Sequence, residues 1–404
     1  MKIISLRLPV FVGCAVALFS GCAGKSVGAA KDWNAAMERE LATLPKQALP
    51  SDKAKFSGEV EAQGAPAVAH STGLARITIP LGTEQPISCF VYYERISAGD
   101  AIQKLFADIV LGEKRLGAFD VGVLATYPYL YAEAAYGIDR GGEKFHGTEK
   151  IIAVSFFQNA LICLHDEVGY RQTFRRVVEG LAASLKIVPA NSLGTYVRAR
   201  QIHRMSRNDA VLGYTEDVWL SNSKNLSDFF EFRSQIDLGS GTAPVANDVV
   251  FGEEVDSKGR LKSGTYLVSE NGQLQTNMKL ESSDRKNYRA AGLLMGRKYS
   301  VKFAAKNALL AHYGENALLA KFASGEASES VTVEHYLPTV KALGPFHKKL
   351  WLKGVAAGGH AKVGAQVGKL ATEGEVDGHG YVSATIPSGQ DTITLERLYT
   401  EGAP

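Results

Sequence analysis

Three residue types that could do nucleophilic chemistry stand together at Cys163, His165 and Asp166. A catalytic thiol needs a histidine within hydrogen-bond reach, because the histidine takes up the thiol proton. The apolar composition of residues 150–165 predicts one or two strands, and side chains two residues apart on a strand face are separated by about 7 Å. That separation is too long for the proton transfer, so the spacing does not favour a cysteine nucleophile.

His165, Asp166 and Glu167 also carry the donor atoms of a metal site. Zinc needs three or four ligands that converge, whereas neighbouring residues of an extended chain point in opposite directions. The other histidines are scattered, and the sequence contains neither an HExxH nor a CxxC motif. A solvated strand end is therefore the favoured interpretation, and no metal or other cofactor is predicted.

Two further motifs resemble functional patterns, but the surroundings of one and the spacing of the other do not fit the chemistry. Ser221 and Lys224 match an SxxK pair, but that pair needs a helix start in a buried cleft, and this segment has the composition of a polar loop. The glycine-rich stretch 354–369 lacks the Walker spacing of a phosphate-binding loop. The sequence also has no GxSxG motif. We therefore predict no catalytic residue and no nucleotide.

One row of aromatic residues suggests a binding surface. Residues 119–131 alternate in hydrophobicity, which predicts a strand with Tyr127, Tyr129 and Tyr131 on one face. Exposed tyrosines are good contact residues because they bury a large area at low entropic cost. The alternative is that the three rings pack beneath an amphipathic helix expected at 169–186.

The N-terminus has the layout of an export signal. A short basic region, residues 1–7, is followed by the twelve apolar residues of 8–19, too few to span a bilayer. The run ends at Phe19-Ser20-Gly21-Cys22, which resembles the lipobox of bacterial lipoproteins, although Phe19 stands where leucine is commonest. The resemblance implies removal of a signal peptide, residues 1–21, and attachment of lipid, including palmitate-type acyl chains, to Cys22.

The residue after Cys22 bears on the destination of the chain. An aspartate there resembles the retention signal of the inner membrane, so Ala23 favours the outer membrane, on its periplasmic face. Residues 22–54 then form a lipidated tether with one short helix. Three acyl chains would hold the protein on the membrane almost permanently. An ordinary signal peptide, with Cys22 unmodified, is the alternative.

This location determines how the remaining cysteines are interpreted. Cys14 lies in the predicted signal peptide and Cys22 at the lipidation site, which leaves Cys89 and Cys163. An even pair in an oxidising compartment favours a disulfide that closes a loop of 74 residues. Two buried free thiols are the alternative.

Residues 55–190 are expected to form an α+β domain. Short β-branched and aromatic runs predict an antiparallel sheet, a helix with an apolar face follows Ser97, and a second helix is expected at 169–186. A sheet with two packed helices is an α+β arrangement. Its layout resembles the PsbP/Mog1-type sandwich, which implies binding rather than catalysis.

Residues 191–404 are expected to form a β-rich domain, which could divide near residue 336. Asn271-Gly272 stands between alternating runs and predicts a two-residue hairpin, because both residues accept positive φ. Asp377-Gly378 is a second hairpin candidate, and residues 307–322 predict a helix.

The overall charge limits the classes of ligand. The chain has a net charge of +3, and near +1 without Lys2 and Arg7 of the signal peptide, which excludes nucleic-acid binding by bulk charge. We expect a non-enzymatic lipoprotein that binds a protein partner or an envelope ligand, or that assists envelope assembly. A periplasmic hydrolase of cell wall or glycan, and an accessory of a secretion system or toxin neutraliser, remain the alternatives.

Overall fold

The computed structural model describes most of the chain after residue 34. The described ranges are 35–50, 56–93, 96–108, 114–140, 143–156, 159–187, 196–221, 228–237, 244–327, 330–341, 343–356 and 360–403. The predicted signal peptide and the predicted lipidation site, Cys22, lie outside them. Within these ranges, none of the helices combines the length and the apolar character needed to cross a bilayer.

The first half of the chain is built on a seven-stranded antiparallel sheet with the order β4-β5-β6-β10-β9-β8-β7. Its strands are β4 (Ala67–Ser71), β5 (Leu74–Ile79), β6 (Ile87–Tyr92), β7 (Lys114–Leu124), β8 (Tyr127–Arg140), β9 (Glu143–Phe156) and β10 (Asn159–His165). Two small antiparallel pairs accompany this sheet: β1 (Lys46–Ala48) with β3 (Glu59–Glu61), and β2 (Phe56–Ser57) with β11 (Lys186–Ile187).

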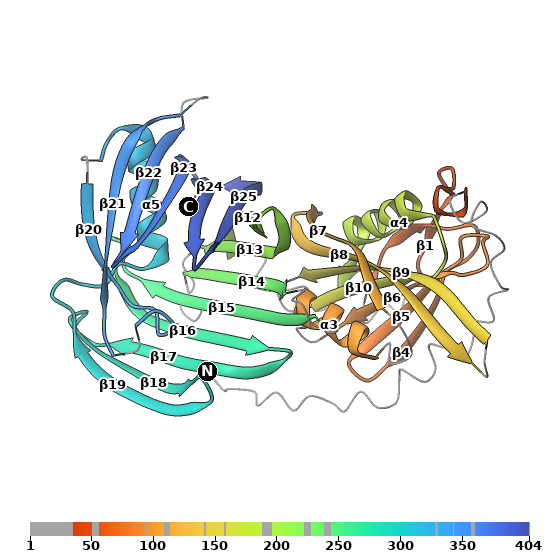
Figure 1. Ribbon diagram of the computed structural model, residues 1–404, viewed down its shortest axis with the longest axis horizontal. Helices are drawn as coiled ribbons and strands as arrows, with labels where there is room; N and C mark the ends of the chain where they lie inside the picture. The colour runs from red at the N-terminus through yellow and green to blue at the C-terminus, as the bar shows by residue number, and fades with distance from the viewer. Residues whose placement is uncertain are drawn as a thin grey trace.

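One helix packs on each face of this sheet. Helix α4 (Arg171–Ser184) buries an apolar stripe that includes Phe174, Val178 and Leu181 against one face, beside the N-terminal strand pair. Helix α3 (Ala98–Asp108) lies on the other face, where it contacts β8, β9 and β10. The same helix also contacts β14 and β15 of the second sheet, so it is wedged between the two halves of the molecule (Figure 1).

The second half is a single antiparallel sheet of fourteen strands with the order β19-β18-β17-β16-β15-β14-β13-β12-β25-β24-β23-β22-β21-β20. Its strands are β12 (Val197–Arg207), β13 (Ala210–Leu220), β14 (Phe229–Asp237), β15 (Val245–Val255), β16 (Leu261–Glu270), β17 (Gln273–Ser282), β18 (Asn287–Leu294), β19 (Arg297–Ala304), β20 (Ser330–His335), β21 (Phe346–Val355), β22 (Ala361–Val367), β23 (Leu370–Asp377), β24 (Gly380–Ser388) and β25 (Asp391–Gly402).

This sheet curls around helix α5 (His312–Ser324) (Figure 1). The helix contacts β15, fifth in the strand order, and also β24, β23 and β22, tenth to twelfth in that order, which only a strongly curved sheet permits. Leu319 and Phe322 of the helix pack with Leu350, Val363 and Val376 in a common core. The inner face of the curved sheet therefore surrounds α5.

Both predicted hairpin turns join neighbouring strands. Asn271 and Gly272 have φ angles of 49° and 73° and connect β16 to β17, as the two-residue turn requires. The turn after Asp377 connects β23 to β24. The sequence also predicted a helix at 307–322, and the structure places α5 at His312–Ser324.

The expected α+β fold class is wrong. The described chain is mostly β, and its two large antiparallel sheets account for most of its residues. The periodicity of α3 and α4 predicts local helices correctly, but a local pattern does not show how many strands share a sheet. Helix α3 is also not devoted to an N-terminal sandwich, since it packs on both sheets.

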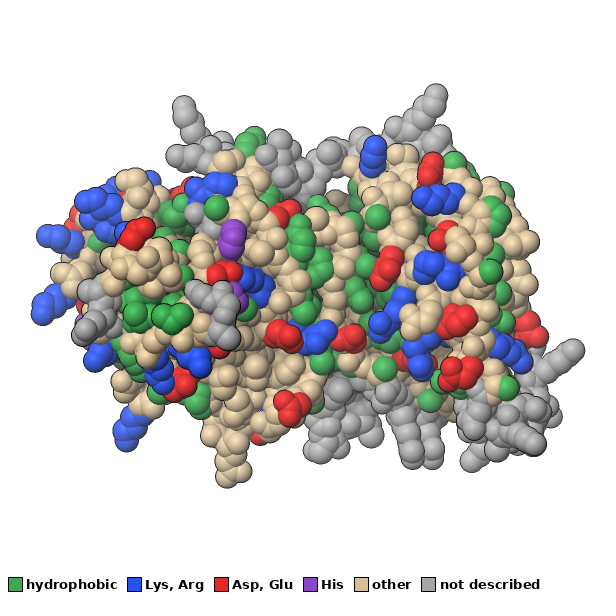
Figure 2. Space-filling view, turned by 90° about the horizontal axis from the view of Figure 1, so that it is seen from above, with side chains coloured by type: hydrophobic (Ala, Val, Ile, Leu, Met, Phe, Trp, Pro, Cys, Tyr) green, Lys and Arg blue, Asp and Glu red, His purple; other side chains and the backbone are tan. Residues whose placement is uncertain are grey.

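The two halves share a continuous core. Ile102 of α3, Leu130 of β8 and Ile162 of β10 pack in one cluster with Tyr214 and Ile236 of the second sheet. Around this core, oppositely charged side chains alternate across the middle of the molecule in the view of Figure 2. The halves are therefore held together by apolar packing, with the ion pair of Arg204 and Asp120 at its margin.

The start of α3 forms a polar link within this core. The hydroxyl of Ser97 donates to Asp248 of β15 at 2.6 Å, and the amide of Gly99 donates to Ser234 of β14 at 2.9 Å. Asp248 is 7% exposed. Its burial, together with the nearby charge of Asp100, raises the pKa of Asp248 to about 7.

We expect this link to make stability depend on pH. Because the pKa of Asp248 is higher in the folded state than in the unfolded chain, its ionisation destabilises the fold as the pH rises from about 4 to about 7. The effect is on the order of 4 kcal/mol, and Asp248→Asn should remove it. Urea unfolding at pH 4 and pH 8 measures this, with exposed Asp209→Asn as the matched control. Equal pH dependence in wild type and Asp248→Asn would contradict the assignment.

Candidate functional site

The disulfide predicted for the first domain is confirmed. Cys89 of β6 and Cys163 of β10 are directly opposite each other in the sheet and are joined by a disulfide bond. Both are fully buried in the core beneath α4. Because its sulfur is bonded to Cys89, Cys163 carries no free thiol in this structure.

The three tyrosines of β8 are not arranged as an exposed surface. Tyr131 is fully buried and Tyr129 is 7% exposed, and the guanidinium of Arg175 from α4 lies 4.1 Å above the Tyr131 ring. Tyr127 packs on Phe156 and lies beneath Arg200 of the second sheet. Tyr129 and Tyr131 thus occupy the core, and Tyr127 lies at the junction of the sheets.

His165 and Glu167 lie close together, with Nε2 of His165 3.9 Å from a carboxylate oxygen of Glu167, but Asp166 faces a different partner. His165 is buried against the rings of Tyr170 and Phe174, and burial lowers the pKa of His165 to about 3. Asp166 accepts a hydrogen bond from the hydroxyl of Tyr136, and Glu167 accepts one from the amide of Gln85 at 3.0 Å. In the described part of the chain, no three potential ligands of this type converge.

A dense group of ionisable side chains instead lies inside the curved sheet at the N-terminal end of α5. We call it the α5 cluster and define it by residues of six elements: Asp217 of β13, Glu231 and Arg233 of β14, Glu253 of β15, His312 and Glu315 of α5, His335 of β20, and Lys348 of β21. Strand register places Asp217 of β13 opposite Glu231 of β14. Glu253 of β15 is opposite Phe229, which is two residues from Glu231 and therefore on the same face of β14.

Glu253 caps the helix that the sheet surrounds. Its carboxylate, on a residue that is 1% exposed, accepts hydrogen bonds of 2.9 Å from the backbone amide and from Nδ1 of His312. A carboxylate is favourable here because the first amides of a helix lack partners and carry a partial positive charge. Burial alone would lower the pKa of His312, but the charge and hydrogen bond of Glu253 outweigh it and raise that pKa to about 9. His312 is therefore a cation at neutral pH.

A second ion pair lies one turn along the helix. Glu315 is bonded to Nζ of Lys348 at 2.5 Å, and Nε2 of His335 lies 3.2 Å from its other oxygen. Burial opposes ionisation of Glu315, but the Lys348 charge prevails and holds the pKa of Glu315 well below its usual range. Burial lowers the pKa of His335, so this imidazole is neutral at pH 7.

Asp217 is the member of the cluster to which no cation of the described chain is bonded, although the charges of His312 and Arg233 act on it. Its strand partner Glu231 accepts a hydrogen bond of 2.8 Å from Arg233, whereas Asp217 accepts none from the residues that the structure describes. Burial, and then the charge of Glu231, raise the pKa of Asp217 well above its usual range. Asp217 is half-buried, so it remains within reach of water.

The charges of the α5 cluster balance only when Asp217 is neutral. Four carboxyl groups face three cations, Arg233, His312 and Lys348, because His335 is uncharged. The excess negative charge can be removed by a proton on Asp217 or by a positively charged group from outside. Binding a proton or a cation is thus the chemistry that this arrangement offers.

The sequence offered little to reveal this cluster. Its members span residues 217 to 348 and form no motif, because the pairing of distant strands brings them together. One local signal is present on β13, where Thr215 and Asp217 take the positions of the inner face of the sheet. A charged residue at an inward strand position indicates either a buried ion pair or a functional site.

We expect the Glu315 pair to stabilise the fold strongly. Glu315→Gln leaves the ammonium of Lys348 largely buried without its anion, which should lower the free energy of unfolding by about 3 kcal/mol. Glu373→Gln, which breaks the exposed pair of Glu373 with Lys353, should cost less than about 1 kcal/mol. Urea denaturation of both variants tests this, and equal losses would contradict a buried pair.

Comparison with known proteins shows a distant likeness to a solved structure. No protein-family model and no curated protein matches the chain. Among solved structures, it is similar to a beta-barrel-like protein of a domain of unknown function, DUF1849, from Brucella abortus, with 9% identity and a TM-score of 0.39. The match covers 51% of this chain and 98% of that one. No comparison shows the PsbP/Mog1-type resemblance expected for residues 55–190.

Proposed function

We propose that this protein is a lipoprotein of the outer membrane, facing the periplasm, that binds an envelope ligand without catalysis. The lipobox-like segment ending at Cys22 supports the anchor. The buried disulfide between Cys89 and Cys163 supports export, because such bonds persist in oxidising compartments. The α5 cluster is the proposed binding site.

The unpaired carboxyl of Asp217 is the observation that carries the choice of ligand. A protonated amine placed between Asp217 and Glu231 would relieve the repulsion of two carboxylates on neighbouring strands. Charge-assisted hydrogen bonds of this kind are about twice as strong as neutral ones. Phe229 and Phe251 are buried and stack on His312, so they fix the position of that cation within the α5 cluster. The ligand is therefore proposed to carry a primary amine.

A hydrolase remains the second candidate, because Asp217 and Glu231 form a carboxyl pair. Side chains directly opposite each other on antiparallel strands have Cβ atoms about 5 Å apart, so the two carboxyl groups can come within the separation of about 5 Å found in retaining glycosidases. A raised pKa on one member is also typical of such pairs. Binding is preferred because Glu231, the prospective nucleophile, already accepts a hydrogen bond from Arg233.

Ligand binding can be tested with a matched pair of small probes. 1,5-Diaminopentane should bind the full chain and pentane-1,5-diol should not, and affinity should rise with pH as Asp217 loses its proton. Asp217→Asn should weaken binding at least fivefold by calorimetry, whereas exposed Asp209→Asn should not change it. Equal binding of diamine and diol would contradict the proposal. Release of fragments from isolated peptidoglycan, lost in Asp217→Asn, would favour the hydrolase.

The anchor can be tested in cells. Labelled palmitate should be incorporated into the wild-type protein and not into Cys22→Ala, which should also leave the membrane fraction, since the acyl chains provide the attachment. Cys14→Ala, inside the predicted signal peptide, should behave like wild type. Membrane attachment of Cys22→Ala would contradict lipidation at this residue.

A further inference from the structure

The outer strands β17, β18 and β19 concentrate positive charge. Residues 273–304, which form these strands and their turns, contain seven basic and two acidic residues, a net charge of +5. The whole chain has a net charge of only +3, so the rest of the molecule is slightly acidic. The positive field is therefore local to one end of the curved sheet.

Strand register places these cations side by side. Arg289 of β18 is directly opposite Lys302 of β19, and Glu281 of β17 is opposite Arg289 on its other side. All three are exposed. Like charges directly opposite each other destabilise a sheet. Arg289, Lys302 and Lys298 make no ion pair or hydrogen bond with any residue of the described chain, so their charge faces the solvent.

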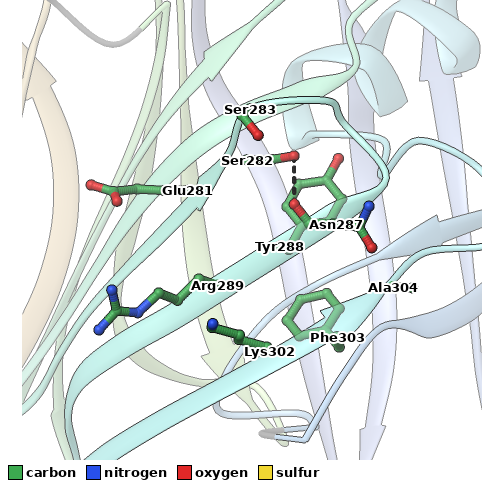
Figure 3. A pocket seen from close by; sticks show the side chains of 9 residues that line it. All are labelled: Glu281, Ser282, Ser283, Asn287, Tyr288, Arg289, Lys302, Phe303 and Ala304. Carbon is green, nitrogen blue, oxygen red and sulfur yellow. Dashed lines mark hydrogen bonds between the residues drawn. The ribbon is translucent and has the colours of Figure 1, made fainter.

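A shallow hollow of about 690 Å³ adjoins this row (Figure 3). The figure shows the charged ends of Glu281, Arg289 and Lys302 on one side of the hollow and the rings of Tyr288 and Phe303 on the other. The two rings stack with centroids 5.7 Å apart and fix this edge of the sheet. Successive side chains of a strand point to opposite faces, so Arg289 and Lys302 lie on the outer face, and Tyr288, only 2% exposed, packs with Phe303 in the core behind them.

The acidic neighbour Asp284 does not neutralise Arg289 and Lys302. Its carboxylate accepts hydrogen bonds from the backbone amides of Lys286 and Asn287 at 2.9 and 2.7 Å, within its own turn. These amide hydrogen bonds hold the pKa of Asp284 far below its usual range. Its charge is thus engaged within the turn, and Arg289 and Lys302 remain available to an external anion.

A second hollow, of about 620 Å³, continues the surface along β18 and β19 and is lined by Leu293, Lys298 and Tyr299 among others. Two consecutive open hollows with cations at intervals suit an extended ligand with repeated negative charges better than a single small ion. Arg289 can hold a carboxylate with two parallel hydrogen bonds. We infer that the outer face of β17–β19 docks an acidic polysaccharide.

The orientation of the molecule favours a polymer, and not the anchoring membrane, as the ligand of β17–β19. The chain near Arg39 packs on the start of α4, with the Tyr170 amide 2.6 Å from the Arg39 carbonyl, and Figure 1 shows α4 and β17–β19 at opposite ends. An anchor at Cys22, 13 residues before Ala35, reaches at most about 45 Å. This step rests on the proposed lipidation, which would keep the α4 end nearest to the membrane.

The experiment compares two charge-matched variants of the full chain. Binding to polygalacturonate, with dextran as the neutral control, should weaken about tenfold in the double variant Arg289→Gln, Lys302→Gln and should fall with added salt. Lys362→Gln, Lys369→Gln removes the same charge from exposed positions of β22 and its turn, and should bind like wild type. Glu281→Gln should bind more tightly.

Three results would overturn the inference. The first is unchanged binding of polygalacturonate by the double variant Arg289→Gln, Lys302→Gln. The second is an equal loss of binding in the control variant Lys362→Gln, Lys369→Gln. The third is binding of the wild-type chain to vesicles of phosphatidylglycerol but not to polygalacturonate. Unchanged unfolding curves would confirm that all variants fold. Asp217→Asn should bind polygalacturonate normally, so failure here and failure of the amine site are distinguishable.

Discussion

A helix whose N-terminus is enclosed by a curved sheet must find partners for its free amides away from bulk water. In this protein the carboxylate of Glu253 is the partner of the His312 amide, and the ion pairs of the α5 cluster follow from that contact. The buried carboxylate requires a cation nearby, and His312 provides it at a hydrogen-bond distance of 2.9 Å. On the next turn of the helix, Glu315 is paired in the same way with the cation Lys348. The sheet can thus close around α5 without leaving the helix start unsatisfied.

The same arrangement leaves one carboxyl in excess, and that excess links the architecture to a function. Pairing of β13 with β14 places Asp217 opposite Glu231, although Arg233 is bonded to Glu231 alone. Ionisation of Asp217 is costly, because this half-buried carboxyl lies opposite a second carboxylate and no described cation is bonded to it. That cost is offset if Asp217 meets a positive group that arrives from outside.

Local features of the sequence predicted local structure well and long-range structure poorly. The cysteines at 89 and 163 and the Asn271-Gly272 turn were predicted because each signal is carried by one or two residues. The fold class was mispredicted because the periodicity of 98–108 and 171–184 shows two helices, but not the fourteen strands of the second sheet. The α5 cluster depends on the register of strands up to 130 residues apart, and no spacing rule encodes it. Total charge also concealed the basic strands β17–β19, because the rest of the chain compensates for them.

The protonation state of Asp217 tests the central claim most directly. Carboxyl-carbon NMR of the full chain, labelled at aspartate and assigned with Asp217→Asn, reports the pKa of this group alone. The account predicts titration well above the usual aspartate value of about 4, and a downward shift of that pKa when 1,5-diaminopentane is added. An ordinary aspartate pKa that does not respond to the diamine would contradict the proposed site.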